Sequence, residues 1–337
     1  MQIAILAHEQ FPERAKTAIG VMRYGPQDVV AVLDRENAGT RVQDHTNLVS
    51  DVPIVASMED VGAVDALVIG IAPIGGAFDD SWRADVENAL SRGCDVISGL
   101  HTFLADDPAF AELAEETGAI INDVRRPPDD LTVAEGIAGD VDAKVILTVG
   151  TDASVGKMTT SYELVEAITD AGHSAAVIPT GQTGIMIENW GYPIDRTIAD
   201  FMAGAVEELV VERGDSYDYL IVEGQGSIVH PAYSGVTTAL LHGSMPDSLV
   251  MVHDPTRTHN HGYPNFPIPP IDEYTAIYEA MSAPVSGATV DAVALNTRDV
   301  DDQTDAHGCV REVEAALNVP ATDIIRFSAD PILEAVL

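Results

Sequence analysis

Apolar and polar positions alternate in short blocks along the first third of the chain, and each block has the length of one strand or one helix. The apolar runs predict strands, and the amphipathic stretches predict helices. The expected strands are residues 3–7, 29–33, 66–71, 96–98 and 119–122, and the expected helices are about 83–92 and 109–116. This order is typical of a Rossmann-like parallel sheet. No G-x-G-x-x-G follows the first strand, which disfavours a dinucleotide cofactor there.

The proline-rich segment RRPPDD (125–130) predicts a linker, so we expect a first domain at residues 1–128 and a second at 129–337. The second domain has the same alternation, which predicts an α/β chain with two parallel-sheet domains. Its expected strands are 145–149, 175–178, 219–222, 248–252, 292–295 and 324–327. One expected helix begins at 157, and two others cover about 197–213 and 309–317. Residues 179–193 are expected to form a long loop.

The stretch VILTVGTDASVGKMTT (145–160) runs from an apolar strand through a glycine-bounded loop to a lysine that opens a helix. This order is that of a phosphate-binding P-loop, in which backbone N–H groups, the helix N-terminus and the lysine face an anion. Two features are unusual: five residues separate the glycines, and Met158 occupies the position of the Mg²⁺-binding hydroxyl. The predicted cofactor-binding residues are Gly150, Thr151, Asp152, Ala153, Ser154, Val155, Gly156, Lys157, Met158, Thr159 and Thr160.

Charge separates this chain from most proteins of its size, because 54 acidic and 17 basic side chains give a formal net charge of −37. The acids are spread along the sequence, as in proteins of salt-loving archaea; a moderately acidic mesophilic enzyme is the alternative. Nucleic acid and anionic membranes are disfavoured as partners. The sequence has no signal peptide or long apolar run, and its two cysteines follow no metal spacing, so we expect a soluble cytoplasmic protein. Enzymes of this size commonly form homo-oligomers, which we expect here.

Two turns at predicted strand ends carry candidate chemistry. Glu223 ends the strand in DYLIVEGQGS, and His230 follows as the candidate general base, with a structural histidine as the alternative. Gln225 and Ser227 in this turn, and Thr180, Gln182 and Thr183 in the TGQTG turn, are candidate substrate-binding residues.

Further candidates come from single positions near strand ends. Arginines could hold a substrate carboxylate or form surface ion pairs, and glycines could admit a ligand or serve only as turns. These candidates are Arg35, Asn37, Gly75, Gly76, Arg196 and Arg257. Asn296 in LNTRD is a candidate for reading a nucleotide base, without the full guanine motif. His253, His259 and His261 lie in a proline-rich loop without an acidic ligand set, so we expect a substrate-lining loop and no metal.

The loop GTDASVGK and the strand end VEG resemble those of dethiobiotin synthetases. Over the whole chain, DRENAGT, GIAPIGG, SGLHTFL, GTDASVGKMTT, TGQTGIMI, VEGQGSIVHPAYSGVTTALLHGS and HDPTR resemble a family with an N-terminal Rossmann-like domain and a C-terminal dethiobiotin-synthetase-like P-loop domain. Its characterised branch comprises D-glutamate N-acetyltransferases.

This resemblance implies transfer of acetyl from acetyl-CoA to a D-amino acid, with the P-loop holding the phosphates of coenzyme A. His230 is then the expected base and Glu223 its orienter or substitute, while arginine binds the substrate carboxylates. The main alternative is an ATP- and Mg²⁺-dependent kinase or ligase in which Thr159 replaces the missing hydroxyl and Glu223 or Asp152 completes the site. A nucleotide or CoA sensor without turnover is a further alternative.

Overall fold

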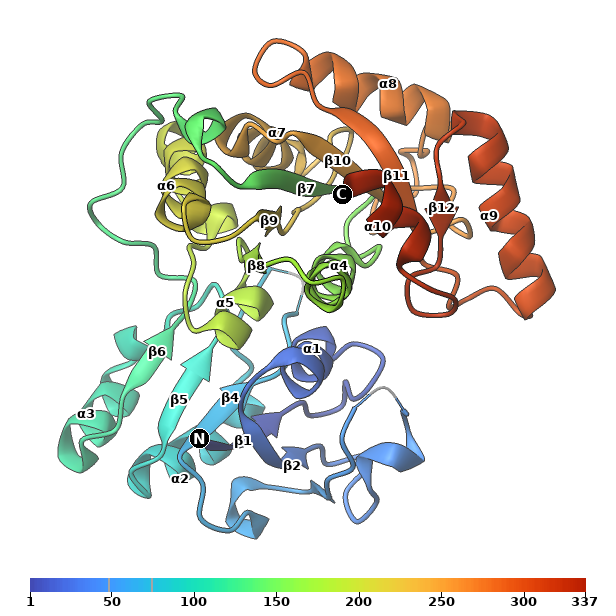
Figure 1. Ribbon diagram of the computed structural model, residues 1–337. Coiled ribbons are helices and arrows are strands. Elements are labelled where there is room, and N and C mark those ends of the chain that lie inside the picture. Colours follow the sequence, from blue (N-terminus) through green and yellow to red (C-terminus); the bar gives the residue numbers. More distant parts are fainter. Residues whose placement is uncertain (48, 74) are drawn as a thin grey trace. The chain divides into compact units, whose positions relative to one another are not determined.

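The computed structural model describes residues 1–47, 49–73 and 75–337, so Ile74 of the GIAPIGG stretch lies outside the described residues. The chain divides into two compact units (Figure 1). The first unit comprises Met1–Pro127 and Gln182–Arg196, and the second comprises Pro128–Gly181 and Thr197–Leu337. The division after Pro127 falls inside the predicted linker. The segment Gln182–Arg196 belongs to the first unit although the second surrounds it in sequence.

A six-stranded parallel sheet forms the first unit, with the strand order β3-β2-β1-β4-β5-β6. This is the Rossmann order, in which the chain reverses direction across the sheet between β1 and β4. The strands are β1 (Gln2–Leu6), β2 (Asp28–Leu33), β3 (Ile54–Val55), β4 (Ala66–Ile69), β5 (Asp95–Ser98) and β6 (Ile121–Asp123). The helices are α1 (Lys16–Tyr24), α2 (Arg83–Ser91), α3 (Pro108–Thr117) and α5 (Gln182–Glu188).

Two helices of the first unit lie where no helix was predicted. The helix α1 carries Gly20 in its interior, which lowers helix propensity. The helix α5 lies in the segment predicted as a loop, and that prediction is wrong. It is seven residues long and contains Gly184 and β-branched side chains, but all except Glu188 are buried. Tertiary burial therefore decides the conformation of α5, against its local propensity.

The second unit is also a six-stranded parallel sheet, in the order β12-β11-β10-β7-β9-β8. Its strands are β7 (Lys144–Gly150), β8 (Ala175–Ile178), β9 (Tyr219–Val222), β10 (Ser248–His253), β11 (Thr289–Leu295) and β12 (Ala321–Thr322). Its helices are α4 (Lys157–Asp170), α6 (Met202–Gly214), α7 (Ser234–Ser244), α8 (Ile271–Ser282), α9 (Gln303–Leu317) and α10 (Asp330–Val336).

Helices cover both faces of this second sheet, which explains why β7 reads as a continuous apolar run. On one face, α4 and α10 pack with Ile146, Ile221 and Val250 in one buried cluster. The helices α6, α7 and α8 contact the sheet separately from that cluster (Figure 1). None of the helices in the described part of the chain is long and apolar enough to span a bilayer.

The predicted final strand at 324–327 is wrong, because the structure has turns there and places β12 at Ala321–Thr322. The Asp323 carboxylate accepts hydrogen bonds from the backbone N–H groups of Ile325 and Arg326, at 3.0 and 2.9 Å. Such a side-chain bond replaces the ladder and bends the chain. The helix expected from 197 begins only at Met202, after a short 3₁₀ turn.

Candidate functional site

The phosphate loop connects β7 to α4 in the centre of the second sheet, between β9 and β10. Two residues of the loop have left-handed backbone, Ser154 at φ 56° and Gly156 at φ 115°. These values turn the chain sharply into α4. The first turn of a helix has backbone N–H groups without intrahelical partners, so α4 presents the amides of its first turn at the loop.

Lys157 is buried beneath this loop, and its Nζ donates to the carbonyl of Asp152 at 2.8 Å. Two glycines make room for its side chain. A Cβ at Gly150 would lie 2.9 Å from Nζ, and one at Gly224 would lie 3.0 Å from Cδ and would also clash with the carbonyl of Thr148. The glycine after Glu223 is therefore required for the close approach of β9 to β7.

Arg257 fixes the loop from the side of β10. Its Nη1 donates to the Asp152 carboxylate at 2.9 Å and to the Ala153 carbonyl at 2.6 Å, and its Nη2 donates to the Ser154 carbonyl at 3.1 Å. Its Nε lies 3.1 Å from the Asp254 carboxylate. All three nitrogens of the guanidinium therefore contact either the phosphate loop or Asp254. These contacts support the loop, whereas the sequence predicted that Arg257 binds a substrate carboxylate.

Asp152 is fully buried at the centre of these contacts. Besides Arg257, its carboxylate accepts hydrogen bonds from the N–H groups of Ala153 and His261, at 2.7 and 2.8 Å. A buried carboxylate requires such partners because desolvation otherwise opposes its charge.

His230 lies fully buried beside Asp152, with Nε2 3.8 Å from a carboxylate oxygen. Its ring stacks on Tyr233 at 4.5 Å and meets Tyr263 edge-on at 5.1 Å. The backbone N–H of Ala232 donates to Nδ1 at 3.1 Å, so the proton of the neutral ring resides on Nε2. Burial lowers the pKa of His230, although the charge of Asp152 opposes this. Nε2 has no hydrogen-bond partner among the described residues.

The VEGQGS and TGQTG turns are joined by hydrogen bonds within the second unit. The Glu223 carboxylate accepts from the N–H groups of Thr180 and Gly181, both at 3.3 Å, and the Thr180 hydroxyl donates to the Glu223 carbonyl at 2.6 Å. Gln225 donates to the Thr180 hydroxyl at 3.3 Å. These bonds place Glu223 at the strand-end turn. The hydroxyl of Ser227 is also engaged, since it accepts from Tyr274 at 2.8 Å.

The remaining predicted residues in and around the phosphate loop differ in their burial and in their hydrogen-bond partners. Asn296 donates to the carbonyl of Val155 at 3.1 Å and so supports the loop backbone. Met158 and Thr159 are half-buried, whereas Thr160 is buried. His253 accepts from or donates to the Thr151 hydroxyl at 2.9 Å, and His259 contacts Thr258. Over the described ranges, no group of three His, Cys, Asp or Glu side chains could hold a metal ion.

Three predicted substrate residues that follow Thr180 in sequence belong to the first unit. Gln182 accepts from Arg125 at 2.7 Å, the Thr183 hydroxyl lies 2.8 Å from that of Thr17, and Arg196 lies over the ring of Phe103. None of them belongs to the unit that holds the phosphate loop. Gln182 and Thr183 follow Thr180 closely in sequence, but the unit boundary after Gly181 places them in a different unit from Thr180.

The candidates near β2 and β4 have local structural partners. Arg35 donates to the Ser81 carbonyl at 2.6 Å and to Asp85 at 3.3 Å, and Asn37 donates to Asp34 at 2.7 Å. Gly75 is exposed in left-handed backbone. Gly76 is buried against the ring and backbone of His101, where a Cβ would collide.

Sequence reasoning missed a polar cluster in the first unit, built from Arg125, His101 and Asp195. Arg125 is buried and forms an ion pair with Asp195, and its Nη1 contacts His101 Nε2 at 2.9 Å. A signal was present, since His101 lies in SGLHTFL and Arg125 in the linker. Because residues 125–130 were predicted to be a linker, Arg125 was not considered as a site residue.

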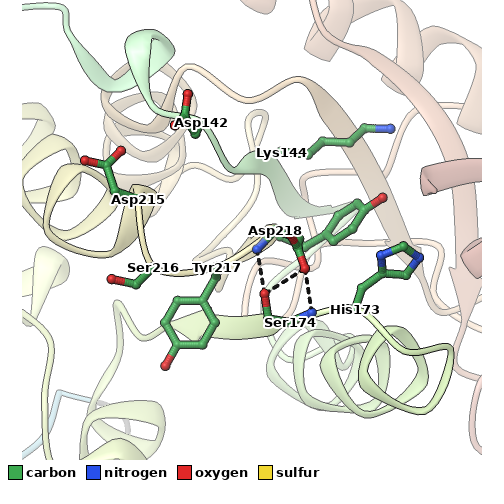
Figure 2. Close-up of a pocket in the computed structure, with 9 residues that line it drawn as sticks. Asp142, Lys144, His173, Ser174, Asp215, Ser216, Tyr217 and Asp218 are labelled. Atoms are coloured by element: carbon green, nitrogen blue, oxygen red, sulfur yellow. Dashed lines mark hydrogen bonds between the residues drawn. The ribbon is translucent and has the colours of Figure 1, made fainter.

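A shallow hollow of about 440 Å³ opens elsewhere on the second unit (Figure 2). Its rim includes Lys144, Ser174 and Tyr219, at or next to the amino ends of β7, β8 and β9. Figure 2 shows Ser174 bonded to Asp218, with which it exchanges bonds of 2.7–2.9 Å. Ligands of open α/β sheets bind beyond the carboxyl ends of the strands, so this hollow is on the wrong edge for a catalytic site.

Comparison with protein-family models assigns both units. The P-loop domain of DUF1611, a domain of unknown function, matches residues 132–333, which is more than half of the chain. The chain belongs to the DUF1611 family. The Rossmann-like N-terminal domain of DUF1611 matches residues 35–127. The predicted family and the predicted α/β fold class are therefore confirmed.

Curated relatives and a solved structure align along most of the chain. A D-glutamate N-acetyltransferase from Tritonibacter scottomollicae is 36% identical over 324 residues, covering 95% of this chain and 93% of the relative. One from Pseudoalteromonas sp is 35% identical over 268 residues, or 79% of each chain. The crystal structure of a DUF1611 family protein from Anabaena variabilis is 40% identical and has a TM-score of 0.95, covering 99% of this chain and 98% of that one. The curated relatives make the chain an enzyme of the acyltransferase class.

Proposed function

We propose that the protein transfers the acetyl group of acetyl-CoA to the amino group of a D-amino acid, with D-glutamate as the first candidate. The observation that carries this proposal is the name shared by the two curated relatives, one of which aligns over nearly its whole length. The unusual phosphate loop supports it independently.

The phosphate loop suits the phosphates of coenzyme A. Its anion-binding elements are the α4 N-terminus, the curved Gly150–Gly156 backbone and Lys157. Met158 carries no oxygen at the position where nucleotide-hydrolysing P-loops supply a hydroxyl to Mg²⁺. Holding an anion needs positive charge and N–H donors, which this loop has.

The neighbouring acids are already engaged in the protein. Asp152 binds Arg257 and two backbone amides, and Glu223 binds two others. An ATP-dependent reaction would require one of them to leave these partners for a metal. We therefore favour the acetyltransferase over the kinase or ligase.

His230 would serve as a hydrogen-bond donor to the bound cofactor. Within the part of the chain that the structure describes, its buried Nε2–H has no hydrogen-bond partner, and such a donor is costly unless a ligand supplies an acceptor. The base role predicted from the sequence would first require Nδ1 to lose its bond from Ala232. Acetyl-CoA would supply the activated acetyl group as a thioester, and the chain's residues would bind it and orient the amine.

The test is release of free thiol from acetyl-CoA in concentrated salt with D-glutamate, and with L-glutamate as the control. We expect release that depends on D-glutamate and falls at least about 100-fold in Lys157→Ala, because a buried cation is lost from the anion site. Arg311→Ala removes an exposed positive charge from α9 and should leave the rate unchanged. Absence of thiol release, with ADP formed from ATP and Mg²⁺, would instead support the kinase or ligase.

A further inference from the structure

Three arginines converge on the turn that follows β5 in the first unit. Arg125 donates from Nε to the carbonyl of Gly99 at 2.6 Å and also contacts His101. The guanidinium carbons of Arg126 and Arg196 lie over the ring of Phe103, at 4.2 and 5.2 Å from its centroid. The turn follows β5 and Arg125 follows β6, so the cluster is at the carboxyl edge of the parallel sheet, where ligands bind in this fold.

The three arginines differ in what they can still bind. Arg125 is buried, and each of its nitrogens already has a partner. Its role is to hold His101, Gln182 and Asp195 in place. Arg196 is exposed, and its guanidinium is positioned by the aromatic ring. Arg126 is about half exposed and pairs with Asp106 at 2.7 Å. Arg126 and Arg196 are therefore accessible to a ligand.

Asp195 supplies an acceptor next to Arg196. One of its carboxylate oxygens binds Arg125, and the other, Oδ1, is buried with no hydrogen-bond partner among the described residues. A buried carboxylate oxygen without a donor is a rare and costly arrangement, so it indicates a donor that arrives with a ligand. An acceptor and a guanidinium on consecutive residues match the ammonium and carboxylate of an amino acid.

We infer that Asp195 and Arg196 bind the α-amino and α-carboxylate groups of the acceptor amino acid and that Arg126 binds its side-chain carboxylate. Three buried or ring-supported cations at one turn, in a chain of net charge −37, fit an acidic substrate. Asp106 and Asp123 lie near Arg126 and could compete with a ligand for it. Asp106 is exposed, so a ligand carboxylate could replace it as the partner of Arg126. Asp123 instead accepts hydrogen bonds from the N–H groups of Leu104 and Ala105. This inference deepens the proposed function, on which it rests for the identity of the substrate as an amino acid.

Direct binding tests the assignment group by group. Calorimetry in the presence of CoA would compare D-glutamate with glutarate, which lacks the amine, and with D-glutamine, which lacks the second carboxylate. Asp195→Asn should reduce the preference for D-glutamate over glutarate at least about tenfold, and Arg126→Gln should do the same for D-glutamate over D-glutamine. Arg196→Gln should weaken D-glutamate and D-glutamine alike, also at least about tenfold. Arg311→Gln is the matched control and should change nothing.

The preference ratios separate recognition from mere loosening of the cluster, because loosening would weaken all three ligands together. Unchanged ratios in Asp195→Asn and Arg126→Gln would overturn the inference, as would wild-type protein that binds no D-glutamate. Variant-sensitive binding without thiol release from acetyl-CoA would preserve this site and remove the proposed acetyl transfer. Thiol release with unaltered preference ratios would support the proposed acetyl transfer and remove this site.

Discussion

Each unit of this protein is organised at one edge around a buried or nearly buried arginine, but the two arginines have different carboxylate partners. Arg257 neutralises Asp152, which is fully buried, and binds two carbonyls of the phosphate loop. Arg125 pairs with Asp195, whose side chain is 27% exposed, and joins segments that are distant in sequence. The first arrangement stiffens a contiguous loop, and the second assembles a surface from separate pieces. The difference predicts how each unit responds to loss of its arginine.

The largest effect is expected from Arg257→Met. The Asp152 charge would remain buried without its cation, which costs about 3–5 kcal/mol of unfolding free energy. Both tryptophans, Trp82 and Trp190, belong to the first unit, so fluorescence reports that unit while circular dichroism reports both. Urea unfolding should show a destabilised circular-dichroism phase with an unshifted fluorescence phase. Equal shifts in the two signals would mean that the units do not unfold separately.

Acid should weaken the second unit through His253, which contacts the phosphate loop at Thr151. Burial lowers the pKa of His253 from 6.5 to about 4. Between these values the unfolded chain binds a proton that the folded state excludes, so stability falls as pH falls, by about 3 kcal/mol at pH 4. Above pH 6.5 the contribution is constant. Urea titrations from pH 7 to pH 4 would measure this loss, and His253→Gln should remove it, whereas replacement of the exposed His259 should not.

The role of His230 can be resolved by two substitutions. As a donor from Nε2, it should lose about 100-fold in kcat/KM on replacement by Ala, while His230→Gln keeps an N–H group and should recover part of that loss. A base role predicts no recovery, since an amide does not accept the proton. Initial rates of thiol release for both variants, with stability checked by urea, distinguish the two.

The smallest effect is expected from Arg125→Met. Asp195 is partly exposed, so solvent can replace some of the lost pairing, and we expect a loss of about 1–2 kcal/mol confined to the first unit. The fluorescence phase of urea unfolding should shift, with less change than Arg257→Met causes in the second unit. A larger shift than that of Arg257→Met would contradict the stated difference in burial between the two carboxylates.

The same contrast explains what could be predicted from the sequence. The phosphate loop occupies consecutive residues between a strand and a helix, so Gly150, Gly156 and Lys157 could be placed by local pattern alone. Most strands of both sheets could also be predicted, because buried parallel strands are apolar runs. The two-residue strands β3 and β12 were missed, because so short a run has no distinct pattern.

The polar cluster of Arg125, His101 and Asp195 could not be predicted in this way, because its members come from three separate stretches that only the tertiary fold joins. The helix α5 was missed for a related reason: burial of its short sequence in the first unit outweighs its low propensity. The partner of Arg257 was equally hidden, since spacing does not show that Asp152 and Arg257 meet. The proposed roles of the site residues stay predictions until they are tested.

Calorimetric titration with coenzyme A in the presence of EDTA would show whether the phosphate loop holds coenzyme A without a metal. We expect the wild-type protein to bind coenzyme A, with affinity weakened at least about tenfold in Lys157→Ala and unaffected in Arg311→Ala. Absence of coenzyme A binding, together with binding of ATP that requires Mg²⁺, would contradict this expectation.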